Sequence, residues 1–223
     1  MQSLEKIKLA YVGMICLFLT TSVQSQAYSF IDSVNTVHKK GVFHTYCQVA
    51  THSDIASAEE VVDDFISEFR GDPLLLFEWA MKGVGQQNDA EKDAIILHLK
   101  ETTFNPETSI GVIKTDIEVP GFTTYKDVSL ESRVLKHRLP SGELRVDVDI
   151  FYSNALLKKA YGSYHVIPLD DNKLLLCMNT YIRFGWFFDL FVTNRRYKNL
   201  VEFRVVKFMN NMSEASEKRM KEK

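Results

Sequence analysis

Side chains that could perform acid–base or metal chemistry are few in this chain and are widely spaced. The six histidines are His38, His44, His52, His98, His137 and His165. None lies in an HExxH motif or in a pair spaced for a metal, so we expect no metal ion and no other cofactor. His98 and His165 are candidates for a general base facing a cavity, but each would need a partner group that the sequence does not supply. A histidine at the surface, or hydrogen-bonded in the core, is the simpler interpretation.

The acidic residues show a strand-like alternation rather than the spacing of a catalytic pair. They include Asp116, Glu118, Glu143, Asp147 and Asp149, which we interpret as the solvated face of a sheet. The chain contains no GxSxG motif, no phosphate-binding glycine loop and no dinucleotide fingerprint. We therefore assign no catalytic residue. Whether the protein is an enzyme stays open, and a non-enzymatic role is favoured.

The first 27 residues have the three-part layout of a secretory signal peptide. Lys6 and Lys8 precede an apolar run from Leu9 to Leu19, and small and polar residues follow as far as Ala27. The run is short for a bilayer span, although an anchor helix that stays attached is the alternative. We expect cleavage near Ser25 or Ala27 and a periplasmic or extracellular protein. Export leaves two cysteines, Cys47 and Cys177, which either pair or remain separate buried thiols.

The elements that must position these residues follow from the hydrophobic pattern. Residues 28–40 are a polar lead-in, and residues 41–51 predict a first strand. A helix capped by Ser53 or Asp54 runs to Gly71, and a short apolar helix follows from Asp72-Pro73 to Gly83. Period-two alternation then predicts six strands at Asp93–Thr102, Thr108–Val119, Tyr125–Arg138, Glu143–Asn154, Leu157–Leu169 and Lys173–Phe184. The stretch from about Gly185 to Met220 begins with a bulky apolar cluster and then becomes a helix of roughly 30 residues, whose apolar stripe must pack on the sheet.

Bulk composition limits the classes of function. The chain has 223 residues, a formal net charge of -2, and 45% hydrophobic and 25% charged residues. These values are typical of one globular domain with a substantial core. The near-neutral charge excludes an electrostatic footprint for nucleic acid. Composition does not indicate the oligomeric state.

This order of elements resembles the START-like, polyketide cyclase-like (SRPBCC, helix-grip) superfamily. The closest local likeness is the final strand and helix, KLLLCMNTYIRFGWFFDLFVTNRRYKNLVEFRVVKFMNNM. The resemblance covers residues 41–220 and implies an α+β fold. That fold would have a curved seven-stranded antiparallel sheet, two short helices after the first strand, and a long C-terminal helix. It also implies that the first and last strands are neighbours, which would allow a cross-strand disulfide between Cys47 and Cys177.

The resemblance further implies a hydrophobic small molecule, lipid-like, held between the sheet and the C-terminal helix. The candidate ligand-binding residues are Phe77, Trp79, Val146, Val148, Ile150, Tyr152, Tyr164, Tyr181, Val201, Val205 and Phe208. The alternative is that these side chains fill a solid core. Two other functions stay open: a cyclase- or hydratase-type enzyme in the same fold, and a ligand-free adaptor that docks through Phe187 or Phe188. The basic residues Arg195, Arg196 and Lys198 indicate a peripheral membrane contact or a solvated helix face.

Overall fold

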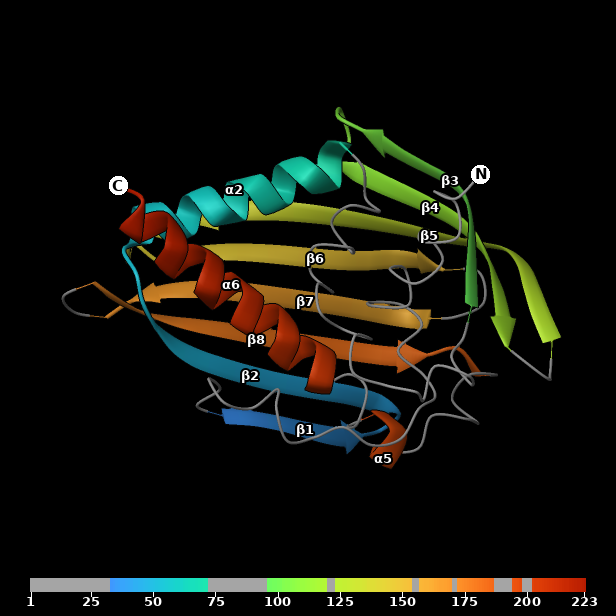
Figure 1. Cartoon of the computed structure of the whole chain (residues 1–223). Coiled ribbons are helices and arrows are strands. Elements are labelled where there is room, and N and C mark those ends of the chain that lie inside the picture. Colours follow the sequence, from blue (N-terminus) through green and yellow to red (C-terminus); the bar gives the residue numbers. More distant parts are fainter. Residues whose placement is uncertain are drawn as a thin grey trace.

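The computed structural model describes residues 33–71, 96–119, 123–153, 157–169, 172–186, 194–197 and 202–223. Its strands are β1 (Ser33–Lys39), β2 (Val42–His52), β3 (Ile96–Asn105), β4 (Ile110–Val119), β5 (Thr123–Arg138), β6 (Leu144–Ser153), β7 (Leu157–Pro168) and β8 (Lys173–Phe184). The helices are α2 (Ile55–Gly71), α5 (Asn194–Tyr197) and α6 (Phe203–Lys221). The strands form one antiparallel sheet in the order β1-β2-β8-β7-β6-β5-β4-β3 (Figure 1).

The predicted α+β helix-grip layout is confirmed, with one correction to the strand count. The sheet has eight strands rather than seven, because residues 33–39, expected to be part of a lead-in, form β1. This strand pairs with β2, and its Thr36 hydroxyl lies 2.9 Å from the Thr45 hydroxyl. The sequence SVNTVHK has only two apolar residues. An edge strand that is mostly exposed lacks the hydrophobic alternation on which the prediction depended.

The sheet has two distinct faces, set by the alternation of side chains along each strand. The inner face carries the buried residues of β2 and β6, including Phe43, Thr45, Val49, Leu144 and Val146. Even-numbered positions of β7 and β8 share this face, as the strand registers require. In Figure 1, α2 and α6 lie over the half of the inner face where β6 and β8 begin. The outer face has no described helix on it.

The helix α2 forms as its sequence predicts. The Asp54 carboxylate accepts hydrogen bonds from the Ser57 backbone N–H at 2.7 Å and from the Ser57 hydroxyl at 2.9 Å. The first of these bonds satisfies a backbone N–H group in the first turn of the helix that has no hydrogen-bond acceptor within the helix. The buried stripe contains Val61, Val62 and Phe65, together with residues at helical spacing on either side.

The helix α6 is shorter than predicted. It has 19 residues, and β8 ends at Phe184 with the separate short helix α5 between them. The helix is buried through residues that include Val205, Met209 and Met212. The predicted second helix and the predicted signal peptide lie outside the described residues.

Candidate functional site

The candidate site lies on the inner face of the sheet beside α6. The Tyr164 side chain of β7 is 6% exposed, and its ring meets the Phe208 ring of α6 edge to face at 5.9 Å. Phe208 also meets Phe65 of α2 at 5.7 Å. This three-ring contact joins the sheet to both helices and fixes the position of the Tyr164 ring.

Next to Tyr164 no side chain projects from the inner face, because the neighbouring position on β7 is a glycine. Gly162 is two residues before Tyr164 on the same face, opposite Val148 of β6 and Thr180 of β8. Among the residues that the structure describes, a Cβ placed on Gly162 would have one neighbour within 4 Å, the Asn179 carbonyl oxygen at 3.7 Å. That is an ordinary van der Waals distance, so the local backbone does not demand a glycine. The described residues therefore leave room for a side chain above Gly162.

Partial exposure marks the same area of the inner face. Val148, Gly162 and Met178 are each partly exposed, whereas Val146, Ile150 and Val166 beside them are buried. Because the register places Val148 opposite Gly162, and Met178 opposite Tyr164, the partly exposed positions are contiguous. We call Val148, Gly162, Tyr164, Met178 and Phe208 the floor site.

The floor site contains one unusual polar group. The Tyr164 hydroxyl is buried and has no hydrogen-bond partner among the described residues. Burial, and to a lesser degree the charge of Cys177, raises the pKa of Tyr164 well above its ordinary value. The phenol therefore stays protonated and can donate one hydrogen bond, but it cannot serve as a base near neutral pH. A buried hydroxyl without a partner costs roughly 1–3 kcal/mol, which a bound acceptor would recover.

The structure brings most of the predicted ligand-binding residues that it describes to this side of the sheet. Val146 and Ile150 are buried on the inner face, and Val205 is buried on α6. Val148, Tyr164 and Phe208 belong to the floor site. Tyr152 lies on β6 opposite Glu131 of β5. Phe77, Trp79 and Val201 lie outside the described residues.

The prediction for Tyr181 is wrong. Tyr181 lies on the outer face of β8, where it is 39% exposed and stacks on His44 with ring centroids 4.1 Å apart. The bulky aromatic residue suggested a cavity wall. The strand register, which the sequence does not reveal, puts it on the opposite face from Tyr164.

Two features of this region were missed by the sequence analysis. One is Gly162, because a single glycine in a strand is a weak signal unless its face is known. The other is Glu202, directly before α6, which is only 8% exposed although its side chain is a carboxylate. Burial is the main cause that raises the pKa of Tyr197 to about 12, and the Glu202 charge adds to it.

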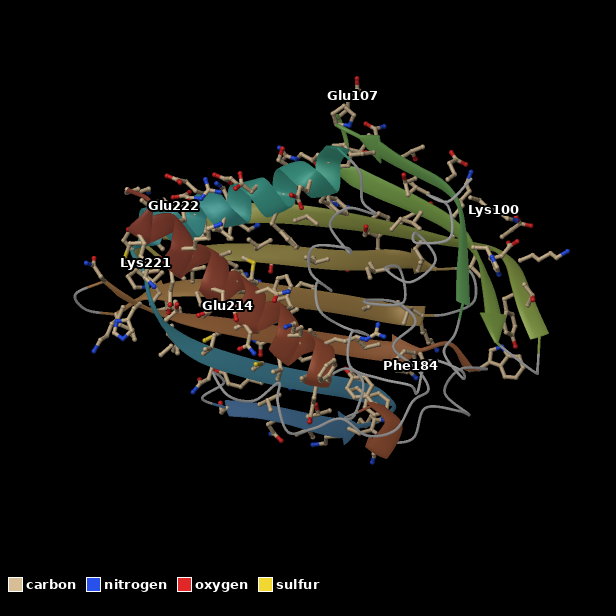
Figure 2. All side chains as sticks on the ribbon, viewed as in Figure 1. Lys100, Glu107, Phe184, Glu214, Lys221 and Glu222 are labelled. Carbon is tan, nitrogen blue, oxygen red and sulfur yellow. The ribbon has the colours of Figure 1, made fainter. Side chains whose placement is uncertain are left out.

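Tyr197 holds α5 against the sheet. Its ring stacks on Phe43 at 3.9 Å and meets the ring of Phe184, labelled in Figure 2 near the end of β8, at 6.3 Å. Its phenol oxygen lies 3.3 Å from the Thr45 hydroxyl, which donates to it. Tyr197 is fully buried, so this contact fixes the short helix to the strands β2 and β8.

The suggestion that His165 faces a cavity is wrong. His165 lies on the outer face, with Nδ1 2.5 Å from Glu143 and Nε2 3.1 Å from the Ser163 hydroxyl. Beside it, the Tyr161 hydroxyl donates to Asp147 at 2.5 Å and accepts from Arg145 at 2.7 Å. Glu143 and Asp147, two of the carboxylates interpreted as a solvated face, are thus partly buried in side-chain networks.

The location of His98 also separates it from the floor site. It lies on the edge strand β3, opposite Asp116 of β4. In the strand order, β3 is at the opposite edge of the sheet from β2 and β8, the strands that α6 contacts.

The two cysteines do not form a disulfide. The prediction that their strands are neighbours is confirmed, since β2 pairs with β8. However, Cys47 is opposite Met178 and Cys177 is opposite Gln48, so the two side chains leave opposite faces of the sheet. Both are buried thiols. Burial raises the pKa of Cys177.

Other potential sites in the described part of the chain offer little for an apolar ligand. A hollow of about 360 Å³ between α2 and α6 is lined mainly by polar and charged side chains, among them Asp64, Glu68 and Arg219. Within the residues described, no three His, Cys, Asp or Glu side chains are grouped so that they could hold a metal ion. Among the helices described, none is long and apolar enough to cross a membrane.

Comparison with known proteins gives structural likenesses only. No family model matches the sequence, and no curated protein matches it. The Zhui aromatase/cyclase from Streptomyces sp. R1128 is 13% identical, with 80% of this chain and 95% of that chain covered and a TM-score of 0.45. A START superfamily protein from Mycobacterium smegmatis is 11% identical, with 78% and 97% covered and a TM-score of 0.45.

A norcoclaurine synthase point mutant from Thalictrum flavum is 8% identical, with 83% and 98% covered and a TM-score of 0.44. The first two structures are of the kinds that the order of elements led us to expect. At these identities and TM-scores, the likenesses carry no argument about activity, and the fold assignment rests on the strand order and helix positions described above.

Proposed function

We propose that the protein binds a hydrophobic small molecule, lipid-like in character, between the inner face of the sheet and α6. The observation that carries the proposal is the room that the described residues leave above Gly162, beside a Tyr164 hydroxyl that has no hydrogen-bond partner among them. Glycine weakens a strand interior. At Gly162, where φ is not in the left-handed region, the backbone gives no reason for it. Space for a ligand supplies that reason.

Binding would rest on burial of apolar surface with one polar anchor. Val148, Met178 and Phe208 offer apolar side chains around the floor site, and burial contributes about 25 cal/mol per Å² of apolar surface. The Tyr164 phenol would donate a hydrogen bond to a carbonyl, hydroxyl or ether oxygen of the ligand. Such a ligand would be mostly hydrocarbon with an oxygen near one end, which describes many lipids and polyketide-like compounds.

The test of binding is a titration of the purified protein with the neutral fluorophore phenylnaphthylamine, followed by competition with a panel of fatty acids, sterols and phospholipids. We expect saturable, stoichiometric binding that an apolar competitor reverses, and weaker binding in a Gly162→Leu variant that remains folded. Equal fluorophore binding by the protein and this variant would place the bound fluorophore elsewhere.

A cyclase- or hydratase-type enzyme is the second candidate, and the buried Glu202 carboxylate favours it. Glu202 is close enough to Tyr197 for its charge to influence the Tyr197 phenol. A carboxylate is a side chain that general acid–base catalysis commonly uses. Glu202→Gln keeps the shape of the side chain and removes the titratable group. Ligand binding that survives in this variant while turnover of a bound polyketide-like substrate disappears would support the enzyme.

We also propose that the chain is exported through its N-terminal 27 residues and acts in the periplasm or outside the cell. The Lys6, Lys8 and Leu9–Leu19 pattern supports this proposal. Intact-mass measurement of protein from cell fractions tests it. A chain beginning between residues 26 and 28 in the exported fraction is expected, whereas an uncleaved chain in the membrane fraction would indicate an anchor.

A further inference from the structure

One end of the outer face of the sheet is strongly cationic. It includes Lys39 at the end of β1, Lys40 of the β1–β2 turn, Lys158 and Lys159 at the start of β7, and Arg183 near the end of β8. All five side chains are exposed. The antiparallel order β1-β2-β8-β7 brings these segments to the same end of the sheet. We call these five residues the basic end.

The basic end surrounds a hollow. Lys158, Lys159 and Arg183 line a cavity of about 250 Å³ with Val42 and Tyr181. A Cβ on Gly41 would lie 3.9 Å from the Arg183 Nε, which places the guanidinium against the β1–β2 turn. Three cations therefore converge on a space large enough for a phosphate-sized group.

The charges of the basic end are not neutralised within the described part of the chain. Some exposed cations elsewhere pair with carboxylates, as Lys114 does with Glu101 and Arg219 with Asp64, whereas others, such as Arg70 and Lys173, stand singly without an ion pair among the described residues. No cation of the basic end forms an ion pair among the residues described. Asp149 lies on the outer face of β6 opposite Tyr161, and it is not ion-paired with them either. Like charges gathered without counter-charges cost energy in the isolated protein, and an anionic partner would remove that cost.

Apolar side chains accompany these cations. Trp186, three residues beyond Arg183, is 81% exposed, and Val37 of β1 is 48% exposed. Tyr181, in the wall of the hollow, is 39% exposed. Exposed tryptophan next to lysine and arginine is typical of surfaces at the boundary between lipid headgroups and acyl chains. A soluble anion would not require the exposed apolar side chains.

We propose that the basic end docks the protein on an anionic phospholipid bilayer. A headgroup phosphate occupies the hollow between Lys158, Lys159 and Arg183, and Trp186 inserts at the interface. The inference is independent of the proposed ligand, because a docked protein with an empty floor site would bind vesicles equally well. The sequence left two interpretations open for Arg195, Arg196 and Lys198, a membrane contact or a solvated helix face. The helix α5, which carries the two arginines, lies by the same end of β1 and β2 in Figure 1.

Vesicle co-sedimentation of the full chain tests the proposal. We compare neutral phosphatidylcholine vesicles with vesicles that contain about a third phosphatidylglycerol. The expected result is stronger binding to the anionic vesicles, which weakens as NaCl rises from about 0.05 to about 0.5 M because salt screens the charges. Binding that does not depend on anionic lipid would overturn the proposal.

A matched pair of variants locates the binding surface. The test variant is Lys158→Gln/Lys159→Gln/Arg183→Gln. The control, Arg70→Gln/Lys173→Gln/Lys221→Gln, has the same change in net charge away from the basic end; Figure 2 shows Lys221 at the opposite end of the molecule from Phe184. Each basic residue near an anionic surface contributes about fivefold in partitioning, so the test variant should lose on the order of a hundredfold. Equal losses in both variants would refute a local site. Because both variants keep the N-terminal apolar run, its contribution cancels.

Two further measurements separate a bilayer from a soluble anion. Trp186 emission should shift to the blue on addition of anionic vesicles, and this shift should disappear in Trp186→Phe. Sodium phosphate at matched ionic strength should displace no more protein from the vesicles than NaCl does. Displacement by phosphate alone, without a fluorescence shift, would assign the hollow to a free phosphate compound and overturn membrane docking.

Discussion

Adding a side chain at Gly162 tests the floor site directly. A glycine inside a strand costs about 0.5–1 kcal/mol relative to alanine. Of the described residues, a Cβ at this position meets only the Asn179 carbonyl oxygen, at 3.7 Å. Gly162→Ala should therefore raise the free energy of unfolding by about that amount. Gly162→Leu should keep the fold and occupy the space of about four ligand carbons. At about 0.8 kcal/mol per buried CH₂, the affinity for an apolar ligand should fall by roughly 3 kcal/mol, about two orders of magnitude.

The assays are urea unfolding followed by circular dichroism, and fluorophore titration at equilibrium. Gly111→Ala provides the matched control, since it makes the same change in a strand on the inner face. There a Cβ would lie 2.8 Å from Phe69 Cζ, so the ring or the strand must move. We expect destabilisation of about 1–3 kcal/mol. If Gly162→Ala destabilises the protein as Gly111→Ala does, the space above Gly162 is filled by core side chains and the reasoning is refuted.

Three other predictions concern single groups. Tyr164→Phe should leave the unfolding free energy of the ligand-free protein unchanged or raise it by about 1 kcal/mol, because it removes a buried hydroxyl that has no partner among the described residues. The same change should weaken binding of a ligand that carries an oxygen. A clear loss of stability in the ligand-free protein would show that the hydroxyl already has a hydrogen-bond partner. Asp54→Ala should lower stability by about 1 kcal/mol near pH 7 through loss of the helix cap. The hydrogen bond from the Ser57 N–H is the main cause that lowers the pKa of Asp54 in the folded protein. This stability is therefore present above the unfolded pKa of about 3.9 and is lost as the pH falls through the folded pKa. Urea titrations at several acidic pH values should show that the unfolding free energy of the variant changes less with pH, and an equal change in both proteins would contradict the assignment. Thiol titration of unreduced protein in denaturant should find both Cys47 and Cys177 reactive, and a reducing agent should not change the melting temperature; a mass lower by two hydrogens would contradict the structure.

The order of helices and strands was predictable because the spacing of apolar residues differs between the two: each helix or strand buries one face, and its apolar residues recur with the period of that element. In β6, Leu144, Val146 and Val148 alternate with charged residues, and the inner face is the apolar one, as in the structure. The strand β1 was missed because an edge strand with few apolar residues gives no alternation. The predicted C-terminal helix was too long because amphipathic spacing does not reveal that α5 and α6 are two separate helices.

The candidate site was only partly predictable, for reasons of register. The residues Val148, Tyr164 and Phe208 could be chosen from the sequence because large apolar and aromatic side chains stand out at known periods. The face on which Tyr181 lies depends on the strand register, and a shift of one residue would move its side chain to the other face of the sheet. The importance of Gly162 depends on what its missing side chain would contact, and Glu202 is distinguished only by its burial. Such features belong to the folded arrangement rather than to any local pattern.

The most direct test of the central claim is native mass spectrometry of the protein purified without detergent, with Gly162→Leu measured in parallel and organic extraction of any added mass. The account predicts a stoichiometric apolar adduct on the unaltered protein, released by extraction and absent from the folded Gly162→Leu variant. An unmodified mass for both proteins, with no thermal shift across the lipid panel, would contradict it, and so would an adduct that the leucine does not displace.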